Sequence, residues 1–148
     1  MKSNNVSFQP GQSHDFMSCF VFFCFTGLNL TFVDSIRMTW HEAKAVCENM
    51  NSHLVEIFSE AQQTIINELV KSKSNDGWWI GLTDKEVEGT FKWYHSNKPA
   101  VYTNCYHTYG YGNSDAYHYV AIYYPPSYDY KWLTRPNTGK YYAICQTT

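Results

Sequence analysis

The alternation of apolar and polar positions predicts two helices followed by a series of short strands. Thr39 and Glu42 form a capping box, in which each side chain accepts a hydrogen bond from the other residue's backbone N–H. The apolar face of this first helix is predicted at Trp40, Ala43, Cys47 and Met50. A second capping box, Ser59 with Gln62, opens the next helix. Its predicted apolar face is Ala61, Ile65, Ile66, Leu69 and Val70.

The short apolar run at residues 78–82 (WWIGL) predicts a buried strand, because it is too short for a globular helix. Gly81 inside this run indicates that another backbone or a large side chain approaches closely. Residues 104–115 contain glycine, asparagine and tyrosine without periodicity, which predicts an irregular loop of the length that is usually functional. Further strands are predicted at residues 32–33, 53–57, 91–94, 119–124, 128–132 and 141–145.

The N-terminal region divides into a polar and an apolar part. Residues 1–15 are polar and are predicted to be disordered, whereas residues 16–28 form an apolar block of signal-peptide length. This block is too short to span a bilayer comfortably, and a buried N-terminal strand is the alternative interpretation. Sequons begin at Asn5 and Asn29. We therefore expect residues 1–29 to precede a single domain at 30–148, in a secreted glycoprotein without a membrane span in the mature chain.

Composition narrows the class of ligand. The 148 residues carry a net charge of −2 with 16% charged residues, which provides no basic field for nucleic acid. All 13 tyrosines lie at Tyr94 or later, so the aromatic content is concentrated in the second half. Tyrosine offers a large rigid face with a polar tip and is common on binding surfaces, although half-buried strands also favour aromatic residues.

Several short motifs follow one another along the chain: residues 39–43 (TWHEA) with Cys47, 53–57 (HLVEI), 79–84 (WIGLTD), 88–93 (EGTFKW), 131–132 (KW) and 142–145 (YAIC). This ordered set resembles the C-type lectin-like domain. The resemblance implies an α+β fold, with two helices packed on small antiparallel sheets and a long irregular ligand loop. It also implies a binding module and not an enzyme.

The cysteines can be compared with the pattern of that family. The resemblance implies a disulfide between Cys47 and Cys145, which would close a loop of about 100 residues. The family's second disulfide would fall at Tyr119 and about residues 136–137, so both of its cysteines are missing here. Cys105 stands where the family usually has tryptophan. It is expected either to be a buried thiol or to form an intermolecular bridge.

The family's sugar-bridging calcium site is largely lost. Sugar-binding members of this family hold Ca²⁺ with two triplets and an acidic pair, because the ion needs six to eight oxygen ligands. Here the triplets align with residues 111–113 (YGN) and 132–134 (WLT), and the acidic pair aligns with Tyr117 and His118. Asn113 is the one ligand that remains, so sugar binding through calcium is disfavoured.

Two other groups of residues contain side chains that can bind a metal ion. The resemblance aligns Asp84 and Glu88 with an auxiliary calcium site to which Asn113 or Asp115 would contribute, but we expect Asp84 to cap a turn and Glu88 to face water. A zinc site at His107 and His118, with Cys105 or Asp115 added, is likewise disfavoured against solvated histidines. No metal ion or other cofactor is therefore predicted.

The remaining prediction concerns the ligand. No catalytic motif is present, and a nucleophile pair of Cys105 with a nearby histidine lacks a third group to orient it. We expect the loop between Cys105 and Tyr119 to bind a glycan or an extracellular protein without calcium. The alternative is a structural or assembly protein, a homodimer bridged through Cys105. The predicted ligand-binding residues are Tyr106, Tyr109, Tyr111 and Tyr117 for stacking, with Asn113, Asp115 and His118 for polar contacts.

Overall fold

The computed structural model describes residues 28–73, 76–106, 115–123 and 128–148. The apolar segment before Leu28, the sequon at Asn5, and the loop residues His107, Tyr109, Tyr111 and Asn113 lie outside the described residues. No helix in the described ranges is both long and apolar enough to cross a membrane. The elements are β1 (Asn29–Met38), α2 (Trp40–Asn49), β2 (His53–Leu54), α3 (Glu60–Lys71), β3 (Gly77–Thr83), β4 (Lys92–Trp93), β5 (Tyr119–Tyr123), β6 (Lys131–Arg135) and β7 (Tyr141–Thr147).

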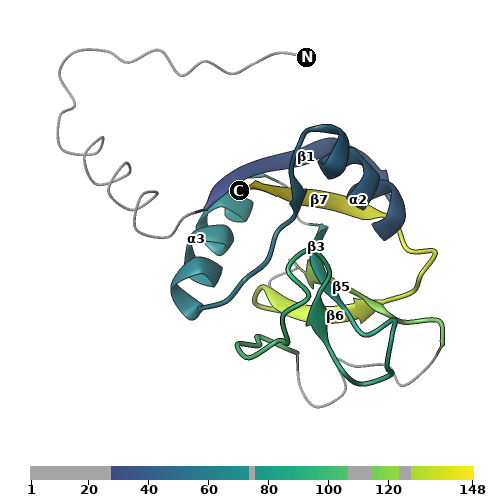
Figure 1. The fold of residues 1–148 in the computed structure, drawn as a ribbon. Coiled ribbons are helices and arrows are strands. Elements are labelled where there is room, and N and C mark those ends of the chain that lie inside the picture. Colours follow the sequence, from purple (N-terminus) through teal and green to yellow (C-terminus); the bar gives the residue numbers. More distant parts are fainter. Residues whose placement is uncertain (1–27, 74–75, 107–114, 124–127) are drawn as a thin grey trace, which may run out of the picture.

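The strands form one mixed sheet in the order β1-β7-β3-β5-β6, with β2 paired to β7 and β4 paired to β3. The β3–β7 pair is parallel, and the other pairs are antiparallel. In Figure 1, β1 and β7 run side by side next to α2, and β5 and β6 lie in the other half of the molecule. The predicted α+β fold is confirmed, although the resemblance implied only antiparallel sheets.

β3 is buried along its whole length and separates two core clusters. Its alternate side chains Trp78, Ile80 and Leu82 join the cluster that contains Ile66 and Val70 of α3. Trp79 points to the opposite face and joins the cluster under α2. Because successive strand residues face opposite sides, one short strand supplies large side chains to both clusters. The prediction of a buried central strand is confirmed.

An indole hydrogen bond and a disulfide fix α2 to the sheet, and a second indole hydrogen bond ties β3 to the end of β1, just before the helix. Trp40 donates its Nε1 hydrogen to the carbonyl oxygen of Ile80 at 2.9 Å, and Trp79 donates to that of Met38 at 2.7 Å. Cys47 and Cys145 form the disulfide that the resemblance implies, with their Cα atoms 5.4 Å apart. The capping box of Thr39 and Glu42 is also present, with both hydrogen bonds formed. The helix is therefore held at its first turn and again near its last.

Several predicted boundaries and faces differ from the structure. The strand expected at residues 32–33 is the ten-residue β1, whose register shifts between Val33 and Met38. The strand expected at 53–57 is only β2, and the strand expected at 128–132 begins at Lys131. The predicted apolar face of α3 is partly confirmed, because Ile66 and Val70 are buried. It is wrong at its N-terminal end, where Gln63 is buried and Ala61 is exposed.

Candidate functional site

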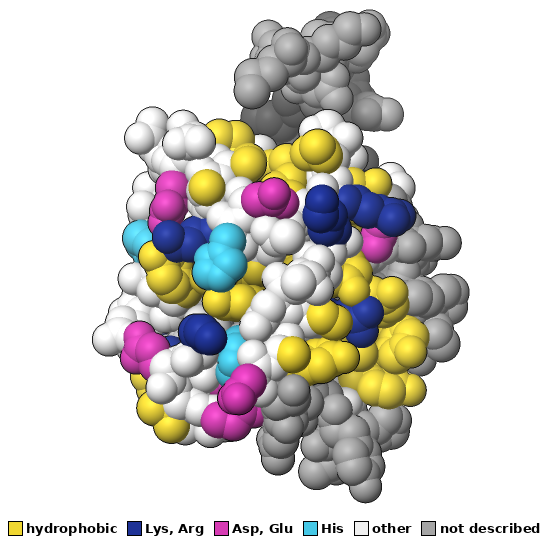
Figure 2. Space-filling model, turned by 90° about the vertical axis from the view of Figure 1, so that its right-hand side faces the viewer, with side chains coloured by type: hydrophobic (Ala, Val, Ile, Leu, Met, Phe, Trp, Pro, Cys, Tyr) yellow, Lys and Arg dark blue, Asp and Glu magenta, His cyan; other side chains and the backbone are white. Residues whose placement is uncertain are grey.

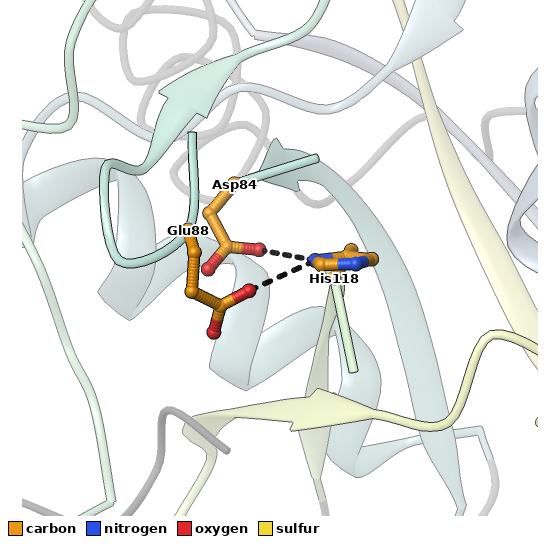
Figure 3. Close-up of side chains that lie close together, drawn as sticks. All are labelled: Asp84, Glu88 and His118. Atoms are coloured by element: carbon orange, nitrogen blue, oxygen red, sulfur yellow. Dashed lines mark hydrogen bonds and ion pairs between the residues drawn. The ribbon is translucent and has the colours of Figure 1, made fainter. Parts of the chain in front are cut away.

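Asp84, Glu88 and His118 bring their side chains together at one end of β3 and β5 (Figure 3). Nδ1 of His118 lies 3.1 Å from Oδ1 of Asp84 and 3.5 Å from Oε2 of Glu88. The ligand atoms of the three side chains all lie within 4.8 Å of one another. Within the described part of the chain, this is the group of histidine, cysteine and acidic side chains whose spacing suits a metal ion.

The strand register explains why residues distant in sequence meet here. Asp84 follows β3 directly and His118 precedes β5, and these two strands are antiparallel neighbours. The backbone N–H of Asp84 donates to the carbonyl oxygen of His118 at 3.3 Å, which extends the pairing past Thr83. The segment after Asp84 folds back on it, because the Gly89 N–H donates to Oδ2 of Asp84 at 2.9 Å, and this places the adjacent Glu88 beside Asp84. Gly89 itself has a φ of +77°, which glycine adopts readily.

Two of the three members of this group are buried. Asp84 is 2% exposed and His118 is 5% exposed, whereas Glu88 lies at the surface. Asp84 caps the turn as predicted, since its Oδ2 accepts from the Gly89 N–H at 2.9 Å. The expectation of a solvated His118 is wrong. The histidine is buried because its position next to β5 turns the ring inward onto Asp84.

Asn137 fixes the segment that leads into β5. Its Oδ1 accepts from the His118 N–H at 3.1 Å, and its Nδ2 donates to the Asp115 carbonyl oxygen at 3.3 Å. Its own N–H donates to the carbonyl oxygen of Ala116 at 2.8 Å. Asn137 lies about where the family's second disulfide would fall. Hydrogen bonds from Asn137 therefore join the segment before β5 to the segment after β6, where the family has a disulfide. The sequence alone does not indicate this role of Asn137.

The described donors of this group combine a nitrogen with carboxylate oxygens, whereas calcium prefers oxygen alone. Ca²⁺ takes six to eight oxygen ligands at 2.3–2.6 Å, and a nitrogen of His118 occupies the position facing both carboxylates. At the other family site, Leu133 offers no side-chain oxygen, and the hydroxyl of Thr134 is buried. The described residues of both sites therefore supply too few oxygens for this ion.

The described members of the predicted ligand site fall into two groups. Tyr106 donates its backbone N–H to the carbonyl oxygen of Trp132 at 3.1 Å, near the end of β5 that Tyr123 occupies. Asp115, Tyr117 and His118 precede the opposite end of the strand, at Tyr119. Four residues of strand separate the two ends by about 13 Å. Asp115 and Tyr117 are exposed, but the buried His118 turns away from that surface.

Tyr106 belongs to a row of aromatic rings that sequence analysis did not find. Its ring centroid lies 4.8 Å from that of Tyr128, which in turn lies 5.3 Å from that of Tyr123. The guanidinium of Arg135 stands 4.9 Å from the Tyr123 ring and donates through Nε to the Tyr141 hydroxyl at 2.7 Å. These tyrosines come from a loop, a turn and two strands, so only their shared clustering in the second half of the chain pointed to them.

A small pocket of about 200 Å³ is lined by residues of α2, of the end of β3 and of the segment that follows β3. Its wall contains Trp40 stacked on Tyr119 with ring centroids 4.4 Å apart, and Lys44 placed 4.7 Å above the Tyr94 ring. The hydrogen bond to Tyr94 raises the pKa of Lys44, and burial raises the pKa of Tyr119. The pocket is lined by Trp40, His41, Lys44, Thr83, Lys85, Glu86, Tyr94 and Tyr119.

The visible surface carries charges of both signs, interspersed with hydrophobic side chains (Figure 2). No single sign of charge dominates the face that the figure shows. This agrees with the small net charge of −2. Nucleic-acid binding, which depends on a basic field, is not supported by this face.

Comparisons with known proteins identify similar domains. The profile of the family described as the lectin C-type domain matches residues 36–147. Hepatic lectin of Gallus gallus is 49% identical over 57 residues, which is 38% of this chain and 26% of that protein. C-type lectin domain family 4 member F of Homo sapiens is 36% identical over 69 residues, or 47% of this chain and 11% of that protein. The chain thus spans about a quarter or less of the length of these two relatives.

Among solved structures, the carbohydrate-recognition domain of the mouse scavenger receptor C-type lectin superposes with a TM-score of 0.68. It is 25% identical, and the match covers 80% of this chain and 88% of that one. A calcium-independent type II antifreeze protein superposes with a TM-score of 0.69 at 23% identity, covering 80% of this chain and 85% of that one. The second likeness concerns the fold alone.

Proposed function

The chain belongs to the family of lectin C-type domains, and we propose that it is a secreted, extracellular module that recognises a glycan or a protein without calcium. Domains of this family are recognition modules and not enzymes, so a binding role follows from membership. Three properties are proposals: calcium independence, the extracellular location, and ligand binding by the tyrosine-rich loop between Cys105 and Tyr119. They rest on the residues that replace the family's calcium ligands.

The replacement of oxygen donors is the observation that carries the proposal. A sugar held through calcium shares the ion's coordination sphere with carboxylates and amides, which supply most of the affinity. Leu133 and Thr134 take the place of the ligands in the last triplet, and His118 faces the carboxylates at the auxiliary site. A domain with this donor set needs another way to hold its ligand.

Aromatic faces offer that other way. Tyr106 and Tyr128 stand half-buried at the base of the loop, with their rings in contact, and Tyr117 is 36% exposed at the far end of β5. Tyrosine gives contact area at a low entropic cost and adds one hydroxyl for hydrogen bonding. Tyr109, Tyr111 and Asn113 belong to the same proposed surface, together with Asp115.

The experiment compares ligand binding with calcium, with EDTA, and with EDTA followed by an excess of one metal. A glycan array and a pull-down from extracellular protein would each be run under these conditions. We expect binding to persist in EDTA, and Tyr117→Ala to weaken it. Binding that disappears in EDTA and returns with calcium would overturn the proposal. A blank glycan array with a specific protein partner would assign the ligand to the protein class.

The alternative role in assembly through Cys105 receives less support. Cys105 is half-buried, is not part of a disulfide, and packs against the core cluster that contains Trp132. The partial burial of this residue limits the access of a second chain to its thiol. Electrophoresis without reductant tests this role, because a disulfide-linked dimer would run at twice the mass of the monomer.

A further inference from the structure

We propose that Asp84, Glu88 and His118 bind a divalent transition-metal ion, for which zinc is the best match. This inference concerns the cluster at the end of β3 and β5, and does not depend on which ligand the domain recognises. It differs from the family's calcium chemistry in the kind of ion, because one ligand is an imidazole nitrogen. Three observations carry it: the donor types, their spacing, and the way the surrounding residues hold them.

The donors are those of a zinc site. Zinc is bound by histidine nitrogen and carboxylate oxygen at about 2.0–2.2 Å, and open sites use three protein ligands with a water in the fourth position. Imidazole suits zinc and its neighbours in the first transition row, whereas calcium prefers oxygen. Two carboxylates and one neutral imidazole also balance the charge of a divalent ion, so the buried pair of Asp84 and His118 would gain a neutral site.

The spacing of the donor atoms agrees with tetrahedral coordination. Ligands about 2.0–2.1 Å from a central zinc stand about 3.3–3.4 Å from one another. The separations from Nδ1 of His118 are 3.1 Å to Asp84 and 3.5 Å to Glu88. The three ligand atoms all lie within 4.8 Å, and Glu88 is exposed and has room to adjust. Figure 3 shows both carboxylates directed at the same ring nitrogen.

The backbone and neighbouring side chains already hold two of the three ligands. Asp84 Oδ2 accepts from the Gly89 N–H at 2.9 Å, which leaves Oδ1 directed at His118. His118 is fixed by its backbone hydrogen bonds to Asp84 and to the side chain of Asn137. Such outer contacts orient metal ligands and contribute to affinity. The exposed Glu88 marks the side from which an ion and its water can enter.

A hydrogen-bonded histidine without a metal is the competing explanation for the same geometry. With its hydrogen on Nδ1, the ring donates to Asp84, and with that hydrogen displaced the same nitrogen offers a lone pair to a metal. The two explanations differ in what added zinc does. If the histidine is only hydrogen-bonded, added zinc has no specific site on the protein. If the three side chains form a metal site, zinc binds there and stabilises the folded state.

The test uses the full chain with its disulfide intact, stripped with EDTA and dialysed, and titrated with zinc chloride or calcium chloride. Calorimetry gives the stoichiometry, and thermal unfolding gives the change in Tm. We expect one zinc per chain and a rise in Tm of about 5–10 °C at a zinc concentration a hundred times Kd. Calcium is expected to bind much more weakly. No zinc-dependent rise in Tm, or tighter binding of calcium than of zinc, would overturn the inference.

Two matched variants locate the ion. Glu88→Gln removes a ligand at an exposed position, so the protein should fold, and we expect zinc affinity to fall by on the order of 10–100-fold. Glu86→Gln lies in the same loop, where its carboxylate pairs with Lys92, and should leave zinc affinity unchanged. His118→Gln should also lose zinc, and Glu88→Gln still decides the matter if that buried variant fails to fold. Equal affinity in the two glutamate variants would mean adventitious zinc only.

Discussion

Gly81 lies directly against the backbone of Leu54: a Cβ atom at Gly81 would stand 3.0 Å from the Leu54 carbonyl oxygen. The carbonyl oxygen of Val55 would be 3.3 Å away, and it accepts a hydrogen bond from the Gly81 N–H at 2.9 Å. The central strand and the segment after β2 can approach this closely because residue 81 has no side chain. The close approach that the sequence predicted at this glycine is therefore confirmed.

Gly81→Ala should destabilise the domain by about 1–3 kcal/mol, because the added methyl group meets two backbone carbonyls that cannot rotate away. Urea denaturation followed by tryptophan fluorescence measures the change. Gly89→Asn is the control, since nothing lies within 4 Å of a Cβ there and asparagine tolerates the positive φ. A Gly81→Ala protein as stable as the wild type would contradict this account of the packing.

Loss of the Cys47–Cys145 disulfide should lower the free energy of unfolding by about 4–5 kcal/mol. The bridge joins residues 98 apart in sequence and so restricts the unfolded chain strongly. The double variant Cys47→Ala with Cys145→Ala, compared with wild type with and without reductant, measures this in urea. Cys105→Ala is the control for the loss of a thiol outside the bridge. A reductant that leaves the wild-type midpoint unmoved would count against this role of the disulfide.

Short-range sequence patterns are sufficient to predict the first helix and the buried central strand. The capping box at Thr39 and the apolar run at Trp78 depend on neighbours within a few residues, and both are found in the structure. The face of α3 was misplaced because Gln63 is polar, yet its amide satisfies the buried indole of Trp132. A polar residue in a core is recognised only when its partner, 69 residues away, is known.

The candidate site depended on contacts between distant residues. Asp84 and His118 are 34 residues apart and meet because β3 and β5 pair in one particular register. The sequence gives both residues but not that register, and a shift by one residue would turn His118 to the other face of the sheet. Asp84 and Glu88 were found through the resemblance, whereas the burial of His118 and the role of Asn137 required the structure.

The capping box at the start of α2 should make stability depend on acid pH. Glu42 accepts the Thr39 N–H at 2.8 Å, and this hydrogen bond lowers the pKa of the carboxyl. A group with a lowered pKa in the folded state contributes stability above its unfolded pKa, and that contribution is lost as the pH falls through the folded pKa. Glu42→Gln should therefore weaken the dependence of stability on pH below about pH 4.

Urea denaturation of wild type and Glu42→Gln at a series of pH values between about 2 and 7 measures this contribution. Glu48→Gln serves as the control, because it removes a carboxylate from the last turn of the same helix, where it pairs with Lys44 at 3.3 Å. If the free energy of unfolding depends on pH in the same way in wild type and in Glu42→Gln, the capping hydrogen bond is not stronger to the ionised carboxylate than to a neutral acceptor.

Gln63 should stabilise the folded domain through its contact with Trp132. Through the same contact it should also fix the backbone position at the base of the tyrosine-rich loop. Oε1 of Gln63 accepts the indole hydrogen of Trp132 at 2.7 Å, and both side chains are buried. The backbone of Trp132 in turn donates to the Asn104 carbonyl oxygen at 2.8 Å and accepts from the Tyr106 N–H. Gln63→Leu leaves the indole N–H buried without its acceptor, which should cost about 1–3 kcal/mol.

A double-mutant cycle separates this hydrogen bond from simple packing. Gln63→Leu, Trp132→Phe and the double variant are compared by urea denaturation, and the double variant should lose less than the sum of the single losses, because the unsatisfied N–H is removed with the indole. If the tyrosine-rich loop carries the ligand, Gln63→Leu should also weaken ligand binding, since Trp132 holds the backbone on which Tyr106 is placed. Additive losses in the cycle would show that Gln63 acts through its volume and not through its amide oxygen.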